Sequence, residues 1–382
     1  MTPLLTRSFE LRLTGHVVFG PGTLARLGEL TRALPVRRVL LITDAGLVNA
    51  GIAARALAAL EGAGLAVSVH DAVREEPREA DVRRALNVAR SVTPEALVVV
   101  GGGSSIDTAK AVNLLLGGGR IRDYRGPRTA RGPLLPIVAV PTTAGTGSEM
   151  QSYALIAEDE HHRKLACGDP GNIPRIVILD PDLLLTLPPR VAASAGADAL
   201  VHALECAVTR TRNPASQLFA EEAFRLLAGH LEAIVQRPDD PDTRAAMLLG
   251  ATWAGQAIEL SMLGAAHAAA NPLSAHHAVV HGHAVALMAP HVVRYNACDL
   301  GAASTYVRLA TSVGWRADPA VLADELTALF GRCGLPTTLR AAGIASPDIP
   351  MLAADASSQW TGQHNPLPVD PRAFASLYRA AS

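Results

Sequence analysis

The segment EALVVVGGGSSIDTAKAVNLLLGGG (95–119) decides the fold, because it contains the signals of a buried strand, a glycine turn and a helix in direct succession. Such strand–turn–helix units build parallel sheets. The turn departs from the GxGxxG dinucleotide fingerprint, since Ile106 occupies the third glycine position, so alone it is a weak signal for phosphate binding. The second glycine cluster, GGGR (117–120), is expected to be the loop that ends the helix.

Outward from this segment, strand and helix signals alternate through the first half of the chain. Strands are expected at 36–44, 65–73, 134–141 and 175–188, helices at 51–64 and 80–92, and a hairpin-like stretch at 153–170. From Pro189 onward the strand signals nearly vanish and Ala- and Leu-rich helical runs take over. We therefore predict an α/β domain over residues 1–188 and an all-helical domain over residues 189–382.

Three features of the first half favour a nucleotide site. The helix N-terminus behind the glycine turn offers free N–H groups to a phosphate. Asp44 ends a strong strand, where a carboxylate can bind an adenosine ribose and repel a 2′-phosphate, which favours NAD over NADP. The alternative interpretation of Asp44 is an Asx turn or a helix cap. PTTAGTGSE (141–149) follows another strand and carries an unusual density of hydroxyl groups for a simple turn.

The second half contains one carboxylate and three histidines that could hold a metal. Asp198 and His202 stand four residues apart in a helical run, which puts both side chains on one face. His267 and His281 lie in a histidine-rich but otherwise apolar stretch. One oxygen and three imidazole nitrogens suit borderline metals such as Fe, Zn, Co, Ni or Mn. Taken alone, such residues are more often surface or capping groups, or satisfied core histidines, than metal ligands.

Composition narrows the class of protein. The 382 residues carry a formal net charge of −1, so nothing marks a nucleic-acid or anionic membrane surface. No apolar run is long enough to span a membrane, and the N-terminus lacks the apolar core of a signal peptide. The four cysteines form no CxxC pair and indicate a reducing compartment, which points to a cytoplasmic protein.

Several long motifs in order resemble the iron-containing, group III alcohol dehydrogenases. They are GGGSSIDTAKAV, VPTTAGTGSE, HHRKLACGDP, DPDLLLTLPP, GADALVHALE and the block H…NPLSA…HG…P…YN, and the resemblance spans residues 16–369. It implies an α/β dinucleotide-binding domain followed by an all-α metal-binding domain, the fold shared with dehydroquinate synthase, with metal and nicotinamide meeting between them. It also implies an NAD(H)-dependent enzyme that interconverts a small primary alcohol and its aldehyde, with Fe2+ (or Zn2+) as its metal, and a homodimer.

Carried over motif by motif, the resemblance implies roles for particular residues. The implied metal ligands are Asp198, His202, His267 and His281. The implied cofactor contacts are Asp44, Gly102, Gly103, Ser104, Asp107, Thr142, Thr143, Thr146 and Lys164. Two positions depart from the family pattern: Asn271 replaces a histidine thought to help proton transfer and is expected to orient the substrate instead, and Glu76 replaces an asparagine before Pro77.

Three alternative functions differ in the residues they need. A keto-acid reductase of the maleylacetate type would need cations beside the metal, for which Arg210, Arg212 and Arg294 are candidates. A lyase of the dehydroquinate-synthase type would carry Glu at the first ligand position, where this chain has Asp198. A non-enzymatic metal- or nucleotide-binding module is disfavoured, because the four ligand positions and both phosphate loops are intact.

Overall fold

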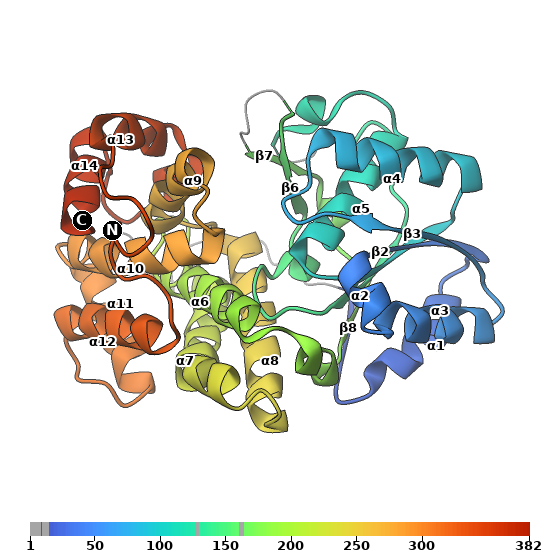
Figure 1. Cartoon of the computed structure of the whole chain (residues 1–382), viewed down its shortest axis with the longest axis horizontal. Helices are drawn as coiled ribbons and strands as arrows, with labels where there is room; N and C mark the ends of the chain where they lie inside the picture. Colours follow the sequence, from blue (N-terminus) through green and yellow to red (C-terminus); the bar gives the residue numbers. More distant parts are fainter. Residues whose placement is uncertain (1–8, 10–14, 127–129, 160–163) are drawn as a thin grey trace. The chain divides into compact units, whose positions relative to one another are not determined.

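The computed structural model describes residues 9, 15–126, 130–159 and 164–382. Within them the chain forms two compact units, residues 15–187 and residues 188–382, and residue 9 belongs to the second (Figure 1). Two segments used in the sequence analysis lie outside the described residues. They are most of the N-terminal segment that was searched for a signal peptide and the HHR of the HHRKLACGDP motif. Among the helices of the described chain, none is long and apolar enough to cross a membrane.

The first unit is built on a six-stranded sheet in which every neighbouring pair is parallel. The strand order is β1–β8–β5–β4–β2–β3. The strands are β1 (His16–Phe19), β2 (Arg38–Asp44), β3 (Ala66–Val73), β4 (Ala96–Gly101), β5 (Ile137–Pro141) and β8 (Ile176–Leu179). The expected hairpin is present as the antiparallel pair β6 (Tyr153–Ala157) and β7 (Lys164–Gly168).

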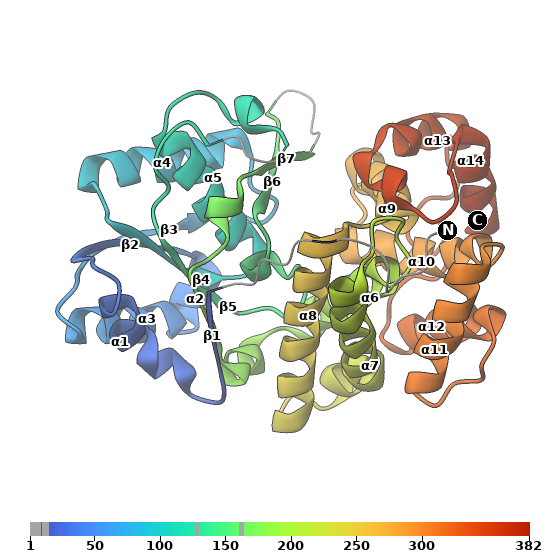
Figure 2. The same cartoon turned by 180° about the vertical axis from the view of Figure 1, so that it is seen from behind.

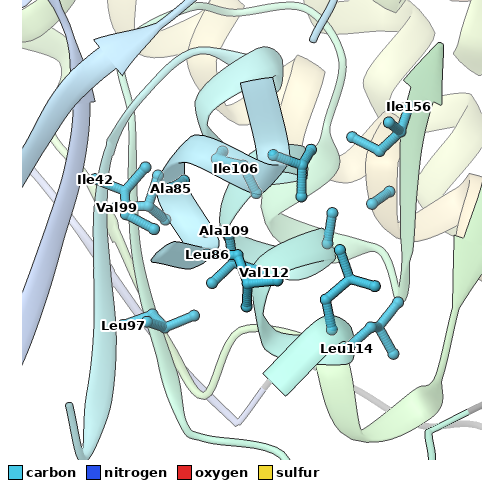
Figure 3. Packing of buried hydrophobic residues seen from close by; sticks show 14 of the residues in the cluster. Ile42, Ala85, Leu86, Leu97, Val99, Ile106, Ala109, Val112, Leu114 and Ile156 are labelled. Carbon is cyan, nitrogen blue, oxygen red and sulfur yellow. The ribbon is translucent and has the colours of Figure 1, made fainter. Parts of the chain in front are cut away.

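Helices cover both faces of this sheet, which is why the inner strands β4, β5 and β8 are continuous apolar runs rather than alternating ones. In β4, Leu97 and Val99 point into one core cluster while Val98 and Val100 point into the other. The helices α4 (Glu79–Val92) and α5 (Gly103–Leu116) close the first cluster, where Ile106 and its neighbours pack against the sheet (Figure 3). The helices α1 (Leu27–Arg32) and α3 (Ile52–Gly62) close the second.

The order of the strands creates a switch point between β2 and β4. From β2 the chain adds β3 on one side and then crosses over to add β4, β5 and β8 on the other. In open parallel sheets, ligands bind outside the carboxyl ends of the strands at such a switch point. The carboxyl ends of β2, β4 and β5 are Asp44, Gly101 and Pro141, so each of the three predicted nucleotide-binding segments begins at this edge.

The second unit is helical throughout its described regular structure, apart from one short 3-10 turn (Figure 2). Its helices are α6 (Pro189–Cys206), α7 (Pro214–Gln236), α8 (Pro241–Ser261), α9 (Ala265–His277), α10 (His281–Asn296), α11 (Leu300–Ser312), α12 (Pro319–Arg332), α13 (Ile349–Ser358) and α14 (Pro371–Ala380). Several begin with proline directly after a capping Asn or Asp, as α7 does after Asn213 and α8 after Asp240. Proline suits this position because its missing N–H has no acceptor in the first turn anyway.

Three details differ from the sequence-based expectations. The strand expected over 175–188 covers only Ile176–Leu179, because Asp180 caps a 3-10 helix that starts at Pro181. The edge strand β1 was not anticipated, since its four residues are too few to show a period. Helix α5 begins at Gly103 rather than near Ser105, which brings the third glycine into its first turn.

Candidate functional site

Helix α6 places Asp198, His202 and Glu205 along one side, at spacings of four and three residues. All three are at least nine-tenths buried. Charged and polar groups in such a setting are costly unless they are paired or ligated. The face of α6 therefore carries a concentration of buried polar groups that packing alone does not explain.

The oxygen Asp198 Oδ1 faces the Nε2 atoms of three histidines. It lies 3.5 Å from His202 Nε2, 3.4 Å from His267 Nε2 and 3.8 Å from His281 Nε2. The rings of His202 and His267 stack with centroids 4.7 Å apart. The structure thus brings the four predicted ligands together, although they come from three helices and span more than eighty residues.

The donor set fits a divalent metal. Ligand atoms about 2.1 Å from a tetrahedral metal lie roughly 3.4 Å from one another, close to the three separations measured from Asp198 Oδ1. The ligand atoms of Asp198, His267 and His281 all lie within 4.8 Å of one another. Both Asp198 Oδ1 and His267 Nε2 are buried, and neither has a hydrogen-bond partner among the described residues. A metal ion would satisfy both atoms.

His281 reaches this cluster because the backbones of α10 and α6 lie very close together. His281 is the first residue of α10, and Gly282 follows it. A Cβ atom on Gly282 would lie 2.2 Å from the carbonyl oxygen of Ser194 in α6. Only glycine therefore allows the first turn of α10 to lie directly on α6.

Glu205 is a buried residue beside the predicted ligands that the sequence-based prediction did not include. Its carboxylate accepts hydrogen bonds from the backbone N–H of Gly264 at 3.0 Å and of Ala266 at 2.6 Å, and it lies 2.6 Å from His267 Nδ1. The residue stands in the quoted GADALVHALE motif, three positions after His202. That spacing on the face of the ligands was the signal that could have found it.

The buried carboxylates and imidazoles shift one another's pKa values. Burial alone would lower the pKa of His267, but the carboxylates of Asp198 and Glu205 outweigh it and raise that pKa to about 9. Burial alone would raise the pKa of Asp198, but the neighbouring histidines, His202 foremost, hold it well below its ordinary value. Asp198 is therefore ionised at neutral pH, as a metal ligand must be.

Asn271 lies one helical turn after His267 on α9. Its side-chain Nδ2 donates to Gln359 Oε1 at 3.1 Å, so the orientation of the amide is fixed by the residue that follows α13. An amide held in this way can position a polar group but does not titrate near neutrality. The predicted role in substrate orientation stays a prediction.

At the sheet edge, Asp44 caps a helix, which is the structural alternative to ribose binding. Its Oδ1 accepts from Leu47 N–H at 3.1 Å and so caps the short helix α2 (Ala45–Asn49). The structure shows no hydrogen bond to Oδ2 from the described residues, and this oxygen faces Gly101 at the end of β4. Capping and ribose binding are compatible, because each uses one carboxylate oxygen.

The glycine turn and the Thr-rich loop pack directly against each other. A Cβ atom on Gly103 would lie 2.5 Å from both Cγ2 and Oγ1 of Thr146, and one on Gly102 would lie 3.2 Å from Thr143 Oγ1. The loop is also held by the Thr142 N–H, which donates to Gly101 O at 3.1 Å. The glycines thus leave space for the threonines, and the N–H groups of the first turn of α5 stand beside them.

Asp107 stabilises the end of the Thr-rich loop through hydrogen bonds to its carboxylate. Its Oδ1 accepts from Ser148 Oγ at 2.5 Å and its Oδ2 from Leu155 N–H at 3.0 Å. The buried ammonium of Lys110 donates to the same hydroxyl at 2.8 Å and to Ser148 O at 2.5 Å. Both oxygens of Asp107 are therefore engaged by the protein, so its predicted cofactor contact would act through the loop it holds.

Lys164 and Ser104, two predicted cofactor contacts, both meet Glu76. Lys164 Nζ lies 2.8 Å from Glu76 Oε1, and the Glu76 N–H donates to Ser104 Oγ at 3.3 Å. Glu76 adopts a left-handed backbone conformation, with φ of 50°. The departure from the family's asparagine therefore places a carboxylate on the lysine that is expected to bind the cofactor.

Two of the three candidate arginines for a keto-acid substrate, Arg212 and Arg294, have hydrogen-bond or ion-pair partners within the helical unit. Arg212 Nη1 donates to the carbonyls of Val208 and Thr209, both at 2.8 Å. Arg294 Nη2 pairs with Asp324 at 2.5 Å. These contacts argue against the reductase of the maleylacetate type.

Comparisons with known proteins cover nearly the whole chain. The family model for "Iron-containing alcohol dehydrogenase" matches residues 14–181, and that for "Fe-containing alcohol dehydrogenase family, C-terminal" matches residues 192–382. Lactaldehyde reductase of Escherichia coli (strain K12) is 32% identical over 373 residues, covering 95% of this chain and 97% of that protein. The NAD-dependent methanol dehydrogenase of Bacillus methanolicus is 30% identical, covering 95% and 97%. A crystal structure of 1,3-propanediol oxidoreductase superposes with a TM-score of 0.93 at 31% identity, covering 98% of this chain and 100% of that one.

Proposed function

The chain belongs to the iron-containing alcohol dehydrogenase family, and on that premise we propose that it interconverts a small primary alcohol and its aldehyde with NAD(H). The observation that carries the proposal is Asp198 Oδ1, buried within 3.4 to 3.8 Å of three imidazole nitrogens. That donor set suits a Lewis-acidic divalent metal. Fe2+ is the expectation from the family, and Zn2+ would bind the same ligands at least as tightly.

The proposed metal ligands are Asp198, His202, His267 and His281. The preference for NAD rests on Asp44, whose carboxylate stands at the switch point where the adenosine ribose would bind. It is supported by the relative from Bacillus methanolicus, which is named as NAD-dependent. The N–H groups at the start of α5, together with Thr142, Thr143 and Thr146, would hold the pyrophosphate.

When bound, the metal would polarise the substrate oxygen and the nicotinamide would exchange a hydride with the substrate carbon. The protein's own residues supply position and charge. Asp198 and the three imidazoles would hold the cation, and the carboxylate of Glu205 lies 2.6 Å from Nδ1 of the His267 ring. Asn271 would orient the substrate, while the proton leaves by another route because an amide is not a proton acceptor at neutral pH.

The test is to prepare metal-free protein, restore it with Fe2+ under anaerobic conditions or with Zn2+, and follow NADH oxidation with short aldehydes and with keto acids. We expect one metal ion per chain and turnover with aldehydes only. His267→Ala should lose metal and activity together, whereas His230→Ala, in α7, should retain both. Full metal occupancy and normal turnover in His267→Ala would refute the assignment of ligands.

The remaining expectations extend this proposal. A homodimer and a cytoplasmic location remain predictions from the family resemblance and from the sparse cysteines. In the structure those four cysteines form no disulfide. The lyase alternative remains disfavoured, because Asp198 and not Glu stands at the first ligand position.

A further inference from the structure

We propose that Glu205 is a positioning residue of the metal centre, which fixes the ring of His267 through a carboxylate that also anchors the start of α9. The inference rests on the proposed metal site. It adds a residue outside the predicted ligand set and explains how a histidine on a separate helix is aimed at Asp198.

The hydrogen bonds at Glu205 define the orientation of the ring. The N–H groups of Gly264 and Ala266 can only donate, so both carboxylate oxygens act as acceptors. His267 Nδ1 lies 2.6 Å from Oε2, and a proton on Nδ1 completes a third hydrogen bond to the same group. In the neutral ring with its proton on Nδ1, which is the form that a bound cation would select, Nε2 keeps its lone pair and faces Asp198 Oδ1 at 3.4 Å. That is the tautomer a metal requires.

The same carboxylate couples the ring to the position of the helix. The first turn of α9 begins after Gly264, and a Cβ atom on Gly264 would lie 2.9 Å from Glu205 Oε1. Carboxylate, helix start and imidazole are therefore packed as one group. The side chain of Glu205 is 5% exposed, so water does not compete for these hydrogen bonds.

Asn365 provides a matched control for the structural part of this role. Its Oδ1 accepts from the Ala265 N–H at 3.3 Å, so it also anchors the start of α9. Its other side-chain hydrogen bonds are with Asn296 and Leu367 O, and neither involves an imidazole. Loss of Asn365 therefore perturbs the helix start and leaves the bond between Glu205 and His267 in place.

The experiment titrates the metal-free full-length protein with Co2+ and measures the Co2+ affinity and the visible absorption spectrum of the complex. The proteins compared are wild type, Glu205→Gln, Glu205→Asp and Asn365→Ala. Unfolding by urea measures the stability of each metal-free variant. We expect both Glu205 variants to bind Co2+ about 10- to 100-fold more weakly with shifted absorption bands. Asn365→Ala should bind with the wild-type spectrum and nearly wild-type affinity, even where its stability falls.

The outcomes separate the two proposals. If the wild type does not bind Co2+, the proposed metal function fails. If the wild type binds but Glu205→Gln keeps its affinity and spectrum, or if Asn365→Ala weakens binding equally, Glu205 has only a structural role. Should the Glu205 variants not fold, nitrogen NMR of histidine-labelled, Zn2+-loaded wild type decides, because a proton on Nε2 instead of Nδ1 of His267 would overturn the inference.

Discussion

Replacing Gly282 by Ala tests whether the packing of α10 on α6 sets the metal geometry. The new Cβ atom would lie 2.2 Å from Ser194 O, a backbone atom that cannot rotate away. Since the contact must open to ordinary van der Waals distance, the first turn of α10 has to move by roughly 1 Å, well beyond the ~0.2 Å tolerance of metal–ligand distances. We therefore expect His281 to leave the coordination sphere.

The assay measures Co2+ affinity and urea unfolding of the metal-free protein side by side. Gly282→Ala should weaken Co2+ binding by at least about tenfold, as misplacing a ligand does, and should cost about 1–3 kcal/mol of stability as an overpacking change. Gly229→Ala is the matched control, because Gly229 lies in α7 with no atom within 4 Å of the added Cβ. That control should be neutral or stabilise by up to about 1 kcal/mol. Wild-type Co2+ affinity in a folded Gly282→Ala variant would refute the reasoning.

The other predictions concern the cofactor edge, the substrate and pH. Asp44→Asn keeps the cap of α2 but removes the charge, so kcat/KM should shift toward NADP by about tenfold or more; an unchanged cofactor ratio would contradict the role of this carboxylate. Glu76→Asn releases Lys164 from an exposed ion pair worth at most about 1 kcal/mol, so NADH should bind up to about fivefold more tightly by fluorescence titration. Asn271→Ala should lower kcat by about tenfold, and a loss of three decades with metal still bound would indicate catalytic proton transfer by this group. The stability of the metal-free protein should fall as pH rises from about 6.5 toward 9, and urea unfolding with and without Zn2+ at each pH checks this.

The sequence predicts the order of elements better than their contacts. Apolar strand runs and glycine turns are local signals, so the parallel sheet and the change to helices after Pro189 could be expected from residues alone. The edge strand β1 was not predicted, because four residues are too few to show the alternation of apolar and polar side chains that marks a strand. The last strand was predicted to be longer than it is, because the apolar residues after Pro181 suit a 3-10 helix as well as a strand.

In the candidate site, too, features that depend on neighbouring residues in the sequence could be predicted, and features that depend on contacts between distant residues could not. The structure brings the four predicted ligands together, and they could be predicted because their residue types and the spacing of Asp198 and His202 are visible in the chain. Glu205 was missed because its partner His267 stands 62 positions away, and its one local signal, the spacing from His202, does not by itself distinguish a buried acid from a solvated one on a helix. Likewise, the glycines of the turn were expected, but the need for Gly103 comes from Thr146, which belongs to another strand's loop.

The pH prediction follows from the balance of charge in this buried centre. Asp198 and Glu205 bring two carboxylates to a place that water hardly reaches, and buried charges are costly unless they are compensated. A divalent cation with neutral imidazoles would bring the formal sum to zero. Without it, a proton on His267 supplies part of the missing positive charge, which is why its pKa rises to about 9. Its folded pKa lies above the ordinary 6.5, so the stabilisation is complete below about 6.5 and lost as pH passes 9. Zn2+ should replace that proton and remove this dependence; a metal-free protein whose stability is flat over this range would show that His267 is not the compensating group.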